Sequence, residues 1–182
     1  MRLVRDLLLT VCFLTLIGLI AMKLERDDAE RLGGAFRVVD GDSLDLDGRK
    51  LRLRAIDAPE LAQTCFRDGL AWPCGAEARE ALKRLMTRKG VVCSGDRTDK
   101  YRRLLVECAA SGEDLNAAMV RSGMAVSFGG YQPEESEARQ AQRGIWAGEF
   151  ERPSDWRKGH RHAMADEKEH GGSFLARLFD LP

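Results

Sequence analysis

The sequence lacks the excess of basic residues that most nucleic-acid-binding proteins carry. Its 182 residues include 29 Lys and Arg against 29 Asp and Glu, so the formal net charge is zero. Any contact with a polyanion must therefore use a local cluster. One such cluster contains Arg97, Lys100, Arg102 and Arg103. Taken alone, it is more typical of a solvated hairpin tip.

The cysteines lack the CxxC spacing of a structural zinc site, which makes zinc binding a weak alternative. An even number of cysteines in a small domain is instead typical of disulfides in an exported protein. Beyond Cys12 there are four, of which the two closest are nine residues apart: Cys65, Cys74, Cys93 and Cys108. We predict the local pairings Cys65–Cys74, around one loop, and Cys93–Cys108, across a turn. Four free buried thiols would require a reducing compartment.

Charged residues are absent from one N-terminal stretch, residues 7–22. As a helix, these sixteen residues would measure roughly 24 Å, slightly less than a hydrocarbon core of roughly 30 Å. Arg2 and Arg5 precede the stretch, so the positive-inside rule predicts a cytoplasmic N-terminus and an exported remainder. A cleaved signal peptide requires small residues at the cleavage site, and Leu19 fits badly before a cut at Ala21. We favour an uncleaved single-pass anchor over secretion after cleavage.

Patterning along the rest of the chain indicates one α+β domain. Residues 43–46 and 50–56 alternate polar and apolar side chains, as half-buried strands do, and Asp47-Gly48 between them is a strong hairpin signal. Apolar periodicity and capping residues predict helices at 75–88, 114–121 and 133–144. We divide the chain into a membrane anchor or signal segment (1–24), a linker (25–34), the domain (35–157) and a polar tail with a short amphipathic end (158–182).

Three short segments carry residues suited to cleaving a phosphodiester. They are Asp40-Gly41-Asp42-Ser43, the stretch from Arg52 to Glu60, and Asp99-Lys100-Tyr101-Arg102-Arg103. Carboxylates can hold a hard cation, and guanidinium groups can contact a phosphate bidentately. A site with all of these groups is equipped for metal-assisted hydrolysis.

In order and spacing, these segments resemble the thermonuclease family, also called the staphylococcal or micrococcal nuclease family. The stretch from Asp114 to Ala125 adds a fourth point of similarity, and the resemblance runs from about Phe36 to about Trp156. It implies an OB-fold, a five-stranded Greek-key barrel that binds oligonucleotides on one face. We therefore predict a five-stranded OB-fold β-barrel with about three helices, preceded by an N-terminal transmembrane helix.

The resemblance also implies a calcium site. It makes Asp42 and Asp57 ligands through their carboxylates and Ala58 a ligand through its backbone carbonyl, where the family commonly has threonine. Calcium takes six to eight oxygen ligands, so waters and the substrate phosphate would complete the shell. The alternative is that the two aspartates only cap turns.

The catalytic residues implied by the resemblance are Arg52, Glu60 and Arg103. The arginines would contact phosphate oxygens as negative charge develops on them. Glu60 would accept a proton from a water near the metal or orient that water, and the sequence leaves both roles open. The predicted substrate-binding residues are Lys100, Tyr101 and Tyr131. Gly129 stands where the family has another tyrosine.

These observations predict a calcium-dependent endonuclease that hydrolyses DNA and RNA, single-stranded or locally opened. We expect it in the cytoplasmic membrane, with the catalytic domain in the periplasmic or extracellular space and no obligate protein partner. One alternative is a non-catalytic OB-fold nucleic-acid-binding module, against which the intact set of acidic and arginine residues argues. Another is a membrane-tethered structural protein whose histidine-containing tail recruits a partner.

Overall fold

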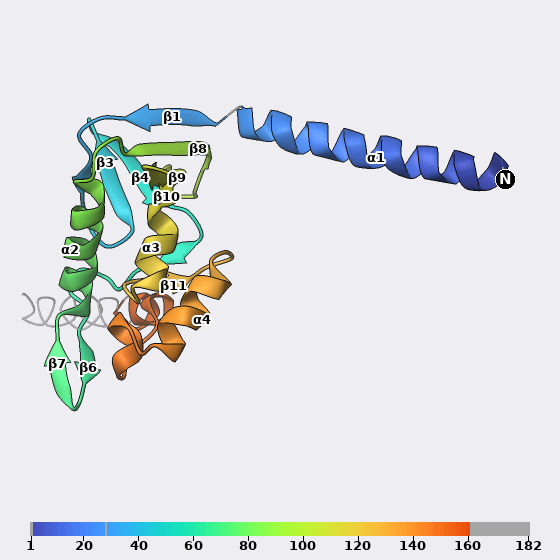
Figure 1. The fold of residues 1–182 in the computed structure, drawn as a ribbon. Helices are drawn as coiled ribbons and strands as arrows, with labels where there is room; N and C mark the ends of the chain where they lie inside the picture. Colours follow the sequence, from blue (N-terminus) through green and yellow to red (C-terminus); the bar gives the residue numbers. More distant parts are fainter. Residues whose placement is uncertain (1, 28, 161–182) are drawn as a thin grey trace, which may run out of the picture.

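The structure is a computed structural model that describes residues 2–27 and 29–160. Most of the predicted tail, including His162 and His170, lies outside the described residues. Helix α1 (Arg2–Asp27) leads away from a single domain that contains all the described strands (Figure 1). The domain combines helices with a strongly curled sheet, so the predicted mixed α+β class is confirmed.

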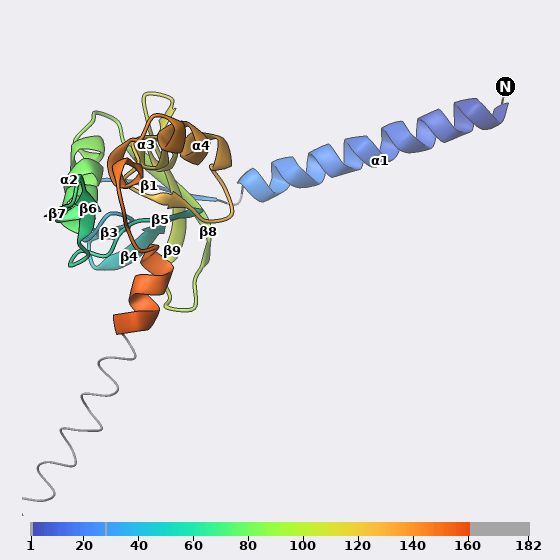
Figure 2. The ribbon, with the colours of Figure 1, turned by 90° about the horizontal axis from the view of Figure 1, so that it is seen from below.

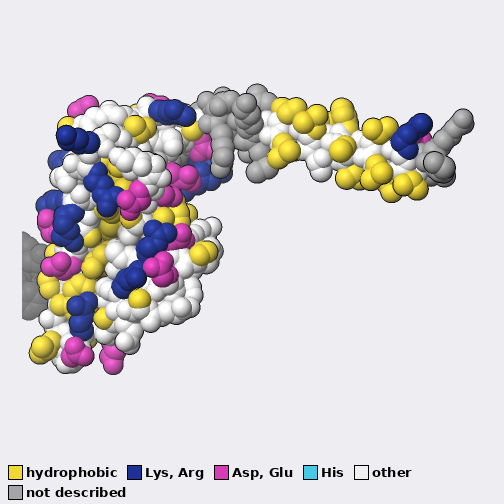
Figure 3. Space-filling model, viewed as in Figure 1, with side chains coloured by type: hydrophobic (Ala, Val, Ile, Leu, Met, Phe, Trp, Pro, Cys, Tyr) yellow, Lys and Arg dark blue, Asp and Glu magenta, His cyan; other side chains and the backbone are white. Residues whose placement is uncertain are grey.

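Helix α1 includes the uncharged stretch on which we based the predicted membrane anchor. Its described apolar side chains between residues 4 and 20 are exposed, and they form the apolar surface at the N-terminal end of Figure 3. Within the part of the chain that the structure describes, no helix meets the length and apolarity needed to cross a membrane. The transmembrane helix predicted from the sequence is therefore not supported by the structure.

The main sheet is larger than the predicted five-stranded barrel. Its strands follow the order β1-β8-β9-β4-β3-β2, with β10 added to β9. Only the pairing of β4 with β9 is parallel. The bounds are β1 (Glu30–Gly33), β2 (Arg37–Val38), β3 (Ser43–Leu46), β4 (Arg49–Leu53), β8 (Val92–Thr98), β9 (Leu104–Ala110) and β10 (Glu113–Asp114). The sheet curls into a half-barrel, which fits an OB-like fold (Figures 1 and 2).

Two small sheets and several helices complete the domain. One small sheet pairs β5 (Ile56–Asp57) with β11 (Val126–Ser127), and the other pairs β6 (Cys65–Arg67) with β7 (Leu70–Trp72). The helices are α2 (Cys74–Met86), α3 (Leu115–Arg121), α4 (Gln132–Gln140), the 3-10 turn η1 (Gly144–Ala147) and a last helix over 153–160. This last helix is orange in Figure 2, and its Arg157 contacts Asp57 of β5.

The β3–β4 hairpin forms as predicted and sets the register of the site. Asp47 and Gly48 both adopt positive φ, 52° and 86°, as a two-residue type I′ turn requires. This turn places Ser43 opposite Arg52 and Leu44 opposite Leu51. The leucine pair is buried in the core, so the hairpin fixes Arg52 next to the segment that carries the first acidic motif.

The predicted strand 50–56 is interrupted, and the interruption shapes the site. Ala55 has a φ of 61°, and the chain turns there before continuing as β5. The backbone N–H of Phe128 donates to the Ala55 carbonyl at 2.8 Å, so the turn is held by the β11 side of the domain. Because the chain changes direction between Arg52 and Asp57, these two side chains can meet.

Both predicted disulfides are present, Cys65–Cys74 and Cys93–Cys108. Two boundaries differ from the predictions. The predicted loop between Cys65 and Cys74 contains the β6–β7 hairpin, and part of the predicted linker 25–34 is strand β1, paired with β8. The three missed strands, β1, β6 and β7, have only three or four residues each with largely exposed side chains, so they show no clear alternation of buried and exposed positions.

Helix α3 follows its prediction and ties the sheet to the helical layer. The Asp114 side chain caps it by accepting a hydrogen bond from the Ala117 N–H at 3.0 Å, and Gly123 ends it with a φ of 70°. Asn116 on this helix is fully buried. Its amide nitrogen donates to the carbonyls of Arg54 and Val106, both at 3.1 Å. The helix therefore holds the strand ends next to the site.

Candidate active site

Arg52 brings the two predicted metal-binding aspartates together. Its Nη1 donates to Asp42 Oδ1 and its Nη2 donates to Asp57 Oδ1, both at 2.8 Å. Both carboxylates are almost completely buried. The β3–β4 hairpin and the turn at Ala55 thus bring together three side chains that are up to 15 residues apart in the sequence.

Burial governs the electrostatics of this group. Desolvation raises the pKa of Asp42 to about 7, although the neighbouring Arg52 guanidinium opposes the rise. Desolvation alone would lower the pKa of Arg52, but the attraction of Asp42 and Asp57 outweighs it and raises that pKa. A bound cation beside Asp42 would favour its charged form in the same way. The protonation state of Asp42 would therefore depend strongly on whether a cation is bound beside it.

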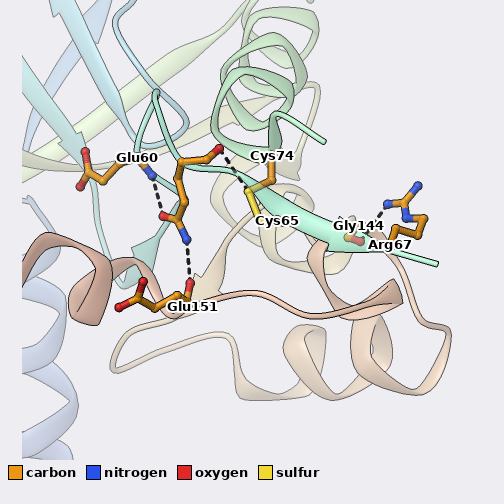
Figure 4. The surroundings of a disulfide bond; sticks show 7 residues. Glu60, Cys65, Arg67, Cys74, Gly144 and Glu151 are labelled. Carbon is orange, nitrogen blue, oxygen red and sulfur yellow. Dashed lines mark hydrogen bonds between the residues drawn. A yellow bond between two sulfur atoms is a disulfide. The ribbon is translucent and has the colours of Figure 1, made fainter. Parts of the chain in front are cut away.

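Glu60 is held from two directions. Its Oε1 accepts a hydrogen bond from Arg157 Nη1 at 2.8 Å, and its backbone N–H donates to Gln63 Oε1 at 3.2 Å. Gln63 is buried, and its Nε2 donates to the carbonyl of Glu151 at 2.7 Å. Figure 4 shows this link between Glu60 and Glu151, next to the Cys65–Cys74 disulfide.

Arg103 is positioned separately, by the turn between β8 and β9. Its Nη2 lies 2.7 Å from Asp99 Oδ2, and Asp99 also accepts hydrogen bonds from the backbone N–H groups of Tyr101 and Arg103. Desolvation would raise the pKa of Asp99, but these hydrogen bonds outweigh it and lower that pKa. Asp99 therefore stays charged and orients Arg103.

One open cleft of about 690 Å³ collects most of the predicted site residues. Those that line it are Arg52, Asp57, Glu60, Lys100, Tyr101 and Arg103. Asp42 lies buried behind Arg52 and is not on the cleft wall. The contact that Ala58 makes is through its N–H, which donates to Asp42 Oδ2 at 3.1 Å. The cleft therefore brings together arginines, carboxylates and an aromatic residue.

Tyr131 is the predicted site residue that the structure places elsewhere. Its hydroxyl donates to Asp114 Oδ2 at 2.9 Å, and it packs against the main hydrophobic core. Burial and the nearby Asp114 charge raise its pKa. In this arrangement Tyr131 joins α4 to the cap of α3 and does not line the cleft.

Several residues of the cleft were missed by the sequence analysis. Phe128, next to Gly129, is 68% exposed and lines the cleft beside Tyr101. Trp156, Arg157, Lys158 and His160 line it from the last helix. Pro153 is the first residue of that helix, and proline at a first helical position is a recognised start signal. That signal could have identified the helix, but not its contact with the acidic residues.

The oxygen donors of this site match the ligand preference of calcium. Among the described residues, no group of three or more His, Cys, Asp or Glu is arranged to hold a metal ion. The two aspartates nevertheless converge, and each carboxylate can accept about four hydrogen bonds. Asp42 accepts three from Arg52, Ser43 and Ala58, and Asp57 accepts three from Arg52 and Arg157. By this accounting each carboxylate has capacity for one more partner, so the donor chemistry of these two side chains fits an oxygen-liganded cation.

Comparisons with known proteins agree with this geometry. The family described as Staphylococcal nuclease homologue matches residues 50–148. The succinoglycan biosynthesis protein ExoI of Rhizobium meliloti is 32% identical over 126 residues, which cover 65% of this chain and 66% of that protein. The probable staphylococcal-like nuclease CAN2 of Oryza sativa subsp. japonica is 36% identical over 124 residues, covering 64% of this chain and 31% of that protein.

Protein ParB of Escherichia coli is 33% identical over 152 residues, covering 71% of this chain and 81% of that protein. The chain therefore spans about two thirds of ExoI and about a third of the rice nuclease. Since the family match covers more than half of the chain and includes Arg52, Asp57, Glu60 and Arg103, this chain belongs to the staphylococcal nuclease homologue family.

Proposed function

We propose that this protein is a calcium-dependent endonuclease that hydrolyses phosphodiester bonds of DNA and RNA. The observation that carries the proposal is the cleft in which Arg52, Glu60 and Arg103 converge beside Asp57. Family membership supports a nuclease-type activity. The rice relative is itself named a probable nuclease, which supports extending that activity to this chain.

The two arginines would bind the scissile phosphate from different sides. Arg52 is largely buried, so its contact with phosphate oxygens would be little weakened by water. Arg103 is oriented by Asp99. Paired guanidinium groups stabilise the negative charge that develops on phosphate oxygens during attack by water.

Glu60 would take a proton from the attacking water or orient that water. The Arg157 contact and the Gln63 link fix where its carboxylate lies. Asp42, Asp57 and the backbone carbonyl of Ala58 would hold calcium, which when bound supplies positive charge that polarises the phosphate and the water.

The mouth of the cleft is suited to a single strand. Tyr101 is exposed, and Lys100 lies over its ring at 5.1 Å. Aromatic faces stack on unpaired bases, and adjacent cations attract the backbone. We therefore propose single-stranded or locally opened DNA and RNA as substrates. Tyr131 is left out of this substrate site because its hydroxyl is bonded to Asp114.

We further propose that the domain works outside the cytoplasm. The support is its two disulfides, because such bonds persist in oxidising compartments. Protease added to intact spheroplasts should degrade the domain, and fractionation will separate a tethered form from a released one. A domain that is found protected in the cytosol would contradict this proposal.

The activity is tested with the full chain, purified with its disulfides intact. Single-stranded DNA and RNA are incubated with calcium or with a chelator, beside Glu60→Ala and the control Glu80→Ala, whose exposed side chain pairs with Lys83. We expect calcium-dependent cleavage that falls about 100-fold or more in Glu60→Ala and is unchanged in the control. Tight binding without cleavage under any metal would instead favour the non-catalytic binding module.

A further inference from the structure

The last described helix, 153–160, contacts the acidic residues of the cleft although it lies beyond the residues that the family match covers, 50–148. Arg157 provides the contact. Its Nη1 and Nη2 donate to Asp57 Oδ1 and Oδ2, both at 3.0 Å. The same Nη1 donates to Glu60 Oε1 at 2.8 Å. One guanidinium therefore bridges a proposed metal ligand and the proposed base.

The result is a row of alternating charges. Asp42, Arg52, Asp57, Arg157 and Glu60 follow one another, each bonded to the next. Neighbouring carboxylates repel each other and would otherwise move apart. Arg52 separates the first two carboxylates, and Arg157 separates the second from the third. Arg157 thus does for Glu60 what Arg52 does for Asp42.

The position of Glu60 depends on this contact more than that of the aspartates does. Glu60 follows Pro59 in an irregular segment, and its side chain is 31% exposed. Among the hydrogen bonds of the described residues, Arg157 is its one side-chain partner. The aspartates, by contrast, are buried and bonded to strand residues.

A second link connects the segment that contains Glu60 to the segment that contains Arg157. The Gln63 amide joins the Glu60 N–H to the carbonyl of Glu151, six residues before Arg157 (Figure 4). The segment 151–160 is therefore linked to both the backbone and the side chain of Glu60. These two links also fix the position of the segment itself.

We propose that Arg157 is a positioning residue of the active site. It sets the distance between the Asp57 and Glu60 carboxylates so that the Glu60 carboxylate lies within hydrogen-bonding distance of the water beside the cation. The inference rests on the proposed nuclease function. It makes the segment 151–160 part of the catalytic site and not only a closing element of the fold.

This role predicts opposite effects on two measured quantities. Arg157→Gln removes a positive charge beside Asp57, so calcium should bind about three- to tenfold more tightly. The same change releases Glu60, so kcat should fall about 10- to 100-fold, the usual size of a loss from misplacing a catalytic group. A purely structural role would weaken calcium binding and turnover together.

Arg157→Lys separates charge from geometry. Lysine keeps the positive charge but cannot donate a planar pair of hydrogen bonds to one carboxylate while reaching another. Calcium affinity should therefore stay within about twofold of the original protein, while kcat should still fall. This variant also keeps the test informative if Arg157→Gln does not fold.

The experiment measures the calcium Kd by titration calorimetry and kcat and KM on single-stranded DNA, using the full chain. Asp155→Asn is the matched control, because it removes an ion pair with Lys158 on the same helix without changing a residue that lines the cleft. A folded Arg157→Lys protein with the original kcat would overturn the inference, as would weaker calcium binding by Arg157→Gln. If the wild-type protein cleaves nothing with any metal, that result would instead overturn the proposed function, and the role of Arg157 with it.

Discussion

The β3–β4 hairpin and the helix 153–160 each contribute an arginine to the same aspartate, but from different surroundings. Arg52 is supplied by a paired strand and its side chain is 16% exposed, whereas Arg157 is supplied by the last described helix and its side chain is 34% exposed. Asp57, 3% exposed, lies between them. The buried arginine is fixed by the register of a sheet, and the more exposed one mainly by its ion pairs.

The difference in exposure between Arg52 and Arg157 should make their contributions to folding stability unequal. Removing one partner of a buried ion pair leaves an uncompensated charge inside the protein. Removing a partner that water can replace costs little stability. The two arginines should therefore have unequal effects on the free energy of unfolding.

The largest expected effect is that of Arg52→Gln. It leaves Asp42 and Asp57 buried without their shared partner, so the free energy of unfolding should fall by about 3–5 kcal/mol. Arg157→Gln should cost about 1 kcal/mol, because solvent screens its contacts. Urea unfolding of both variants measures the difference. Equal losses of stability would remove the distinction between the two regions.

The disulfides allow the same comparison one step further from the cleft. Replacing either cysteine pair by alanine should cost roughly 2–4 kcal/mol of unfolding free energy. Only the loss of Cys65–Cys74 should also lower kcat. The reason is that Phe66, beside Cys65, exchanges two backbone hydrogen bonds with Glu149, at 2.8 and 2.9 Å, just before the segment that holds Glu60.

The pair Cys93–Cys108 joins β8 to β9 within the main sheet and serves as the control. Turnover is compared in low urea, at a concentration where both alanine variants are fully folded. If removal of Cys93–Cys108 lowers kcat as much as removal of Cys65–Cys74, then support of the C-terminal segment does not explain the effect.

A third arginine, Arg103, tests whether orientation by a carboxylate matters generally. Asp99→Asn should lower kcat about tenfold, because it weakens the contact that orients Arg103. The pKa of Asp99 is lowered in the folded protein. Its contribution to stability is therefore present above the pKa of the unfolded state and is lost as the pH falls through the lowered pKa. Unfolding of the variant should depend less on pH below 4 than unfolding of the original protein.

The smallest expected effect is that of Tyr131→Phe. It removes the hydrogen bond to Asp114 and should cost about 1 kcal/mol of stability. Both kcat and KM should stay unchanged, since Tyr131 does not line the cleft. A raised KM would return Tyr131 to the substrate site, as the sequence first suggested. Phe128→Ala provides the contrast, since its exposed ring lines the cleft and its loss should raise KM.

Local chemistry made the hairpin side of the site predictable. Asp47-Gly48 specifies a two-residue turn, and the alternation around Leu51 specifies which face of the strand is buried. The motif order then placed Asp42, Arg52, Asp57 and Glu60 in one site, and the cleft brings three of them to its surface with Asp42 behind. Cysteine spacing was sufficient for the disulfides because both pairs are local.

The helix side was not predictable, because its contacts depend on tertiary structure. Nothing local distinguishes Arg157 from the other arginines in the charged stretch around it, since its partners lie 97 and 100 residues earlier. Strand β1 was missed for a related reason. Its residues are mostly polar and exposed, and it is held by backbone pairing with β8 and by the bidentate contact of Glu30 with Arg49.

The β3–β4 hairpin and the helix 153–160 should form one catalytic unit, in which Arg157 acts through Glu60. A double-mutant cycle in kcat tests it most directly, with Glu60→Gln, Arg157→Gln and the double variant assayed on single-stranded DNA with saturating calcium. Residues that act as one unit give strongly non-additive losses. We predict that the double variant will be no slower than Glu60→Gln alone. Losses that multiply would show instead that Arg157 acts independently of Glu60.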